Sequence, residues 1–322
     1  QLHGHNILDN KIKKKKNEHL SFRSDTVMVI TAVFCNFLWG SAFPAVKTGY
    51  RLFGIAEGDA ASQILFGGVR FTLAGILVIL TGSLTARKPL VPHRSSVSRI
   101  LKLCMFQTVF QYIFFNIGLA HTSGVKSSII EATSVFSAIL ISGIIFRMEK
   151  ITAHKLYGCL LGFIGVLLVN LTGNSLDMTF RINGEGFILI STVSYAFSTV
   201  MMKRYSEKEN PVMLSGWQFV FGGMIMMSAG AAAGGSLHMS SSACFPLMLY
   251  LAFISSTAYT LWGLLLKYHP VSKVTVYGFT NPVFGVLLSA LILNEGSLIM
   301  HWQVLAALPL VCIGIWYVNR CS

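Results

Sequence analysis

The chain has 322 residues, of which 53% are hydrophobic and only 11% are charged. Soluble globular domains carry about 25% charged residues, so this composition excludes a water-facing surface and indicates a protein embedded in a lipid bilayer. The formal net charge of +13 would suggest nucleic-acid binding in a soluble protein. Here the cations lie between apolar runs, where they orient a membrane protein, and we expect no nucleic-acid partner.

Ten segments are apolar over the roughly 20 residues that a membrane-spanning helix needs. They cover residues 26–50, 62–84, 99–120, 126–146, 152–171, 184–203, 212–232, 244–266, 272–293 and 300–319. Their hydrophobicity is continuous and does not alternate with a period of two, which excludes a β-barrel. The sequence therefore predicts an all-α, polytopic integral membrane protein with ten transmembrane helices.

The basic residues predict how these helices are oriented. Residues 1–25 form a polar tail with five lysines between positions 11 and 16, and the apolar segment after it is long enough to remain as an anchor. With the amino terminus inside, 20 of the 25 Lys and Arg residues lie on the cytoplasmic side and three lie outside. This bias predicts a cell-membrane protein with both termini in the cytoplasm.

Two halves of the chain resemble each other. The run Gly68-Val-Arg-Phe71 in the second segment parallels Gly216-Trp-Gln-Phe219 in the seventh, and Glu149 parallels Glu295. Each half contains five predicted helices, and because five is odd the second half would be inverted in the membrane. Transporters built in this way bind substrate between the halves near the bilayer midplane. The predicted domains are the tail at 1–25 and repeats at 26–171 and 184–319.

Several runs together resemble the EamA family of the drug/metabolite transporter superfamily. They are Trp39-Gly-Ser-Ala-Phe-Pro44, Arg70-Phe71, and Asn281-Pro-Val-Phe284 followed by Asn294-Glu-Gly296. The similarity covers nearly the whole chain after about residue 26. It implies a ten-helix secondary carrier, of a kind that often exports amino acids, metabolites or toxic compounds.

The chain departs from this family at two positions, which leaves its substrate open. Phe136 stands where the second repeat has Pro282, and Glu131 is acidic where a typical member has a neutral residue.

Three ionisable residues fall within predicted spans, namely Lys47, Arg70 and Glu131. Such residues are costly in a membrane and suggest a function. Glu131 either forms a charge pair with Arg70 or Lys47, or binds a cationic group or a coupling proton. Arg70 could be structural, since its counterpart Gln218 is neutral, and Lys47 could extend to the lipid headgroups.

Aromatic and polar residues at mid-helix predict a ligand cavity. The predicted substrate-binding residues are Trp39, Tyr195, Trp262, Tyr277, Asn281 and Glu131. Alternatively, such polar residues join helices and such aromatics form interfacial belts. Pro44 and Pro282 interrupt helical hydrogen bonding and are predicted hinges.

The sequence therefore predicts a secondary active transporter, an exporter of a small organic metabolite that works by alternating access. Protons are a candidate coupling ion, and the protein is expected to be a monomer or homodimer. The alternatives are a passive channel, which needs a polar stripe, and a membrane-embedded enzyme, which needs a catalytic constellation. We expect no enzyme activity, cofactor or metal.

Overall fold

The computed structural model describes residues 22–56, 58–119, 121–122, 124–170, 180–292 and 302–320, which form helices and connecting turns without a β-strand. Most of the basic tail lies outside the described residues, and so does the run Asn294-Glu-Gly296. The expectations for these two segments remain predictions.

Seven helical segments among the described residues are long and apolar enough to cross a membrane. They comprise α2 (Asp25–Leu52), α3 (Ala60–Ala86), α4 (Arg94–Cys104) with η1 (Met105–Phe110) and α5 (Gln111–Leu119), α6 (Gly124–Ala132) with α7 (Ser134–Leu140) and η2 (Ile141–Ile145), η3 (Ile182–Gly186) with α9 (Phe187–Ser206), α10 (Pro211–Ala232) and α11 (Cys244–Tyr268). The remaining elements are α8 (Ala153–Asn170), α14 (Trp302–Arg320), and the succession of α12 (Val271–Thr275), η4 (Val276–Phe279) and α13 (Thr280–Ile292).

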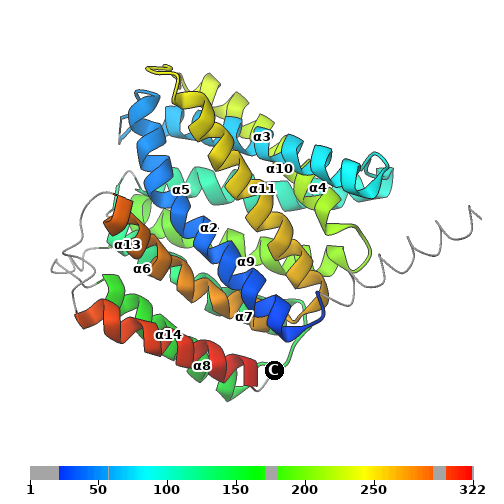
Figure 1. The fold of residues 1–322 in the computed structure, drawn as a ribbon, viewed down its shortest axis with the longest axis vertical. Helices are drawn as coiled ribbons and strands as arrows, with labels where there is room; N and C mark the ends of the chain where they lie inside the picture. Colours follow the sequence, from blue (N-terminus) through cyan, green and yellow to red (C-terminus); the bar gives the residue numbers. More distant parts are fainter. Residues whose placement is uncertain are drawn as a thin grey trace, which may run out of the picture.

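Glycines allow α3 and α10 to pack closely along their length, where Figure 1 shows the two helices side by side. A Cβ atom on Gly75 would lie 2.6 Å from the Gly216 carbonyl oxygen, and one on Gly68 would lie 2.9 Å from that of Gly223. We call these four residues the glycine seam. Small residues permit such approach in membranes, where van der Waals packing drives helix association.

The pair α8 and α14 packs in the same way and lies apart from the α3–α10 pair in Figure 1. A Cβ atom on Gly158 would lie 2.8 Å from the Gly314 carbonyl oxygen, and one on Gly314 would lie 2.6 Å from that of Gly158. Close contacts between glycines therefore hold α8 against α14, as they hold α3 against α10.

Two helical segments between these pairs are interrupted. A turn at Thr133 separates α6 from α7, and the 3-10 segment η4 separates α12 from α13. Pro282 follows this second break in the first turn of α13, whereas α2 continues through Pro44 without interruption. No proline follows the first break. Phe136 occupies the position that matches Pro282, and its ring packs against that of Phe279 with centroids 6.3 Å apart.

Glu149, in the turn between η2 and α8, contacts the start of α12. Its carboxylate accepts hydrogen bonds from the Val271 and Ser272 backbone N–H groups and from the Ser272 hydroxyl, and it pairs with Lys155 at 3.0 Å. Nearby, the Lys273 ammonium pairs with Asp25 at 2.7 Å. These contacts link α2 and the turn before α8 to α12.

Candidate functional site

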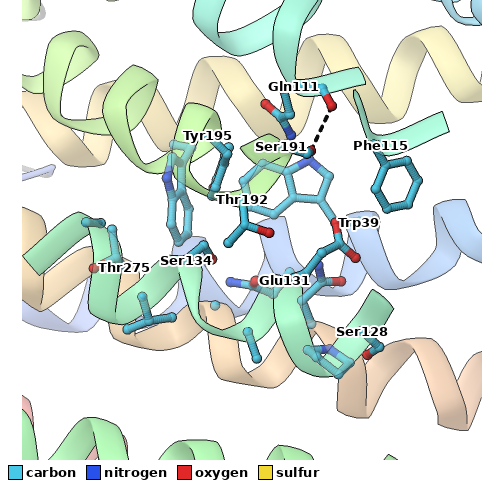
Figure 2. A pocket seen from close by; sticks show the side chains of 18 of the residues that line it. Trp39, Gln111, Phe115, Ser128, Glu131, Ser134, Ser191, Thr192, Tyr195 and Thr275 are labelled. Carbon is cyan, nitrogen blue, oxygen red and sulfur yellow. Dashed lines mark hydrogen bonds between the residues drawn. The ribbon is translucent and has the colours of Figure 1, made fainter. Parts of the chain in front are cut away.

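A cavity of about 180 Å³ lies among α2, α3, α5, α6, α7, α9, α11, α12, η4 and α13. Figure 2 shows Trp39, Glu131, Thr192 and Tyr195 around this space. The polar and aromatic lining consists of Asn36, Trp39, Arg70, Gln111, Tyr112, Phe115, Ser128, Glu131, Ser134, Ser191, Thr192, Tyr195, Tyr259, Trp262, Thr275 and Asn281. Aromatic walls with a few polar groups are typical of sites for small organic ligands.

The structure brings together five of the six residues predicted to bind substrate. Trp39, Glu131, Tyr195, Trp262 and Asn281 all line the cavity, although they come from helices far apart in the sequence. Their role in binding remains a prediction, because a lining position is necessary for a ligand contact but does not prove one.

Tyr277, the sixth predicted residue, lies outside the cavity lining. It is 5% exposed, and its hydroxyl accepts a hydrogen bond from the Asn319 side chain on α14 at 3.3 Å. Tyr277 belongs to η4, where the tighter 3-10 winding changes which residues share a face. Its neighbours Thr275 and Gly278 face the cavity instead.

One wall of the cavity is an aromatic cluster. The Trp39 ring meets Trp262 at 5.1 Å and Tyr259 at 5.0 Å between centroids, both edge to face. The hydroxyl groups of Tyr259 and Tyr112 are 2.8 Å apart and hydrogen-bonded. This cluster joins α2, α5 and α11 and offers both ring surfaces and polar edges to a ligand.

Five buried polar atoms on lining residues have no hydrogen-bond partner among the described residues. They are two indole donors and three amide acceptors: Trp39 Nε1, Trp262 Nε1, Asn36 Oδ1, Gln111 Oε1 and Asn281 Oδ1. Leaving a buried polar group unsatisfied costs about 1–3 kcal/mol. Five such atoms around one cavity are best explained by a polar ligand or solvent that satisfies them.

Arg70 brings a positive charge to the cavity and is 8% exposed. Its Nε atom donates to the Ser255 hydroxyl at 2.9 Å, and its guanidinium lies 5.2 Å from the centroid of the Phe71 ring. No carboxylate forms an ion pair with Arg70 within the described part of the chain. An arginine at this depth costs about 2.5–3.5 kcal/mol or more, so an unpaired one calls for a functional explanation.

Glu131 brings a carboxyl group to the same cavity from α6. Between the residues that the structure describes, it forms an ion pair with neither Arg70 nor Lys47. Lys47 is exposed and is not part of the cavity lining. Of the two predicted cations, therefore, only Arg70 shares the cavity with Glu131.

Sequence reasoning missed several lining residues that helical spacing could have revealed. Asn36 precedes Trp39 by one turn of α2, and Thr192 precedes Tyr195 by one turn of α9. Residues three or four apart lie on the same helix face. Once Trp39 and Tyr195 were assigned to the cavity, the polar residues one turn earlier followed from this spacing.

A helical bundle with membrane-length helices around a polar and aromatic cavity defines the chain as a multi-pass membrane transporter, a class that the comparisons confirm. The EamA-like transporter family matches residues 26–171 and 182–320. The chain therefore belongs to the EamA-like transporter family.

Known relatives agree with this assignment. The chain is 27% identical to an uncharacterized transporter of Archaeoglobus fulgidus, over 91% of this chain and 98% of the relative. It is 24% identical to a probable amino-acid metabolite efflux pump of Escherichia coli, over 85% of this chain and 88% of that protein. A solved crystal structure superimposes with a TM-score of 0.74 at 14% identity, covering 93% of this chain and 98% of that one, which supports the fold.

Proposed function

We propose that this protein is a secondary active transporter that exports a small polar organic metabolite, such as an amino acid, by alternating access. In this proposal ten helices form two inverted repeats, 26–171 and 184–319, with both termini on the cytoplasmic side of the cell membrane. The cavity between the repeats is the substrate site, and protons are the candidate coupling ion.

Hydrogen bonds across the bundle support the inverted arrangement. Arg70 on α3 bonds to Ser255 on α11, and the Gln218 side chain on α10 accepts a bond of 2.7 Å from Thr108 on η1. Arg70 and Gln218 occupy matching positions in the two predicted repeats. An inverted pair of repeats relates Thr108 to Ser255 in the same way, so the two bonds would be equivalent.

The contacts between α3 and α10 support the same relation. The first glycine of each repeated motif contacts the second glycine of the other, so that Gly68 meets Gly223 and Gly216 meets Gly75. Between them the matching residues Phe71 and Phe219 stack at 5.3 Å. Equivalent residues meet each other in this way only near an axis that relates the two halves.

The observation that carries the functional proposal is the set of unsatisfied polar atoms around the cavity. Two indole N–H groups and three amide oxygens belong to side chains that line a cavity of about 180 Å³ bordered by aromatic rings. These two donors and three acceptors match a small molecule that has both hydrogen-bond acceptors and donors. The printed name of the Escherichia coli relative, an amino-acid metabolite efflux pump, supports the same class of substrate.

Alternating access requires contacts that close each end in turn. The Glu149 and Asp25 contacts lie at the end that the charge distribution predicts to be cytoplasmic, and in this proposal they hold that end closed. The breaks at Thr133 and η4 adjoin the cavity, since Ser134 and Gly278 line it. We propose that these breaks, with Pro282, are the points at which the helices bend when the closed end opens.

Counterflow in proteoliposomes tests this proposal. The purified protein should exchange radiolabelled amino acids across the membrane, and Trp39→Ala or Tyr195→Ala should reduce the rate at least about tenfold, because each removes a cavity wall that holds the substrate. Trp316→Ala is the control, since that ring is 54% exposed on α14 and distant from the cavity lining.

Normal exchange by both cavity variants would contradict the proposed site. Failure of the wild-type protein to exchange any member of a broad panel of amino acids, amines and organic acids would contradict the proposed function.

A further inference from the structure

The cavity contains two opposite charges that do not neutralise each other. Arg70 and Glu131 both line it, yet they form no ion pair with one another or with any other described residue. Opposite charges in a space of low polarity attract strongly. Their separation therefore requires that the structure hold them apart.

Arg70 is held in place from α3. The hydrogen bond from its Nε atom to Ser255 and the contact with the Phe71 ring fix the guanidinium on one side of the cavity. Glu131 projects from α6, and Figure 2 shows it beside Trp39 and Thr192. Tyr112 lines the same cavity. Its hydroxyl is engaged by Tyr259, which keeps this phenol in place.

The unsatisfied polar atoms of the cavity complement the two charges. The indole N–H groups of Trp39 and Trp262 are donors, as is the guanidinium of Arg70. The amide oxygens of Asn36, Gln111 and Asn281 are acceptors, as is the carboxylate of Glu131, and each of these side chains lines the cavity. A ligand that satisfies both sets needs an anionic acceptor and a cationic donor in one small molecule.

We propose that the cavity selects a small zwitterion, with Arg70 facing its carboxylate and Glu131 facing its ammonium group. This proposal rests on the proposed transport function and narrows its substrate class. A simple amine would neutralise Glu131 and leave Arg70 buried without a partner, and a simple acid would do the reverse. A zwitterion satisfies both charges. Because the ligand has no net charge, the net charge of the cavity does not change when it binds.

Binding of matched ligands to the purified protein tests this selection. L-leucine, L-threonine and L-phenylalanine are each compared with the amine lacking the carboxylate and the acid lacking the amino group. At least one amino acid should bind about tenfold or more tightly than both of its analogues, because a charge-assisted hydrogen bond is lost with each removed group. An amine or acid that binds as tightly as its amino acid overturns the proposal, as does absence of binding by all three amino acids.

Two single substitutions should change the preference in opposite directions. Glu131→Gln should weaken amino-acid binding about tenfold or more and make the acid the best of the three ligands, because Arg70 remains. Arg70→Gln, which introduces the residue that the chain already has at Gln218, should make the amine the best ligand. Lys47→Gln is the control and should leave the order unchanged, since Lys47 is exposed outside the cavity.

Melting temperatures without ligand show whether each variant is folded, and Arg70→Lys replaces Arg70→Gln if the latter is not. Lysine keeps the charge, so the preference for the amino acid should persist with reduced affinity. Equal weakening of all three ligands by Glu131→Gln overturns the proposal. Counterflow separates this failure from failure of the proposed function: exchange of amines or acids as rapid as that of amino acids would retain the transporter and reject the zwitterion.

Discussion

Glu149 shows how a single side chain can join two distant parts of the chain. Its carboxylate accepts the backbone N–H groups of Val271 and Ser272 at the start of α12, and the Lys155 ammonium neutralises its charge. The side chains of Glu149 and Lys155 are 12% and 6% exposed. A carboxylate at a helix amino terminus satisfies donors that have no partner within the helix.

Replacing Glu149 with Ala should therefore lower the free energy of unfolding by about 3–5 kcal/mol, the typical cost of breaking a buried pair. Chemical denaturation in detergent, followed by tryptophan fluorescence, measures this loss. Adding Lys155→Met should recover part of it, since the double variant has no buried unpaired cation. Glu207→Ala is the control, because Glu207 is exposed. Equal stability of the Glu149 and Glu207 variants would show that the contacts of Glu149 do not stabilise the protein.

The residues of the candidate site were only partly predictable from the sequence. Trp39 and Tyr195 are aromatic residues in the middle of predicted helices, and both line the cavity. The predicted span 272–293 is one continuous helix, whereas the 3-10 segment η4 interrupts it at Tyr277. The separation of Arg70 from Glu131 depends on Ser255, a contact between distant helices that sequence spacing alone does not show.

At the scale of helices, the glycine seam (Gly68, Gly75, Gly216 and Gly223) determines how closely α3 and α10 approach. At Gly68, Gly75 and Gly223 a side chain would meet backbone atoms, which cannot move aside as a flexible side chain can. In a membrane, this packing supplies much of the attraction between helices.

Gly75→Ala should therefore destabilise the protein by about 1–3 kcal/mol, the usual cost of overpacking, because the added Cβ atom would lie 2.6 Å from the Gly216 carbonyl oxygen. Gly263→Ala on α11 is a matched control, since its nearest contact would be an ordinary 3.5 Å. Alanine stabilises a helix relative to glycine by about 0.5–1 kcal/mol, so the control should be neutral or slightly more stable. If Gly75→Ala and Gly263→Ala change the melting temperature equally, close packing at Gly75 does not determine stability.

The helices themselves were largely predictable, because long apolar runs have few alternatives in lipid. Predicted segments 62–84 and 212–232 correspond to α3 and α10, which run from Ala60 to Ala86 and from Pro211 to Ala232. The interruption at Thr133 was not predicted, since no proline or glycine marks it. Phe136, three residues after this turn, contacts Phe279 in the other half of the chain, a contact that sequence spacing alone does not show.

For the whole molecule, orientation in the membrane is the property that the charge distribution predicts most directly. In a background without native cysteines, a membrane-impermeant maleimide applied to intact cells should label Ser242→Cys and leave Ser95→Cys unlabelled. Both positions are exposed in the structure, so permeabilised cells should show labelling of each and serve as the control. The reverse pattern in intact cells would place the termini outside.

The reciprocal contacts between α3 and α10 have a consequence for the transport cycle. If the two halves exchange conformations between outward-facing and inward-facing states, most interfaces must be rebuilt. An interface in which Gly68 meets Gly223 and Gly216 meets Gly75 is different, because exchanging the halves returns the same set of contacts. The α3–α10 interface can therefore serve as a fixed pivot about which the two halves rotate. The energy barrier between the two states would then be determined by the contacts at the two ends of the bundle.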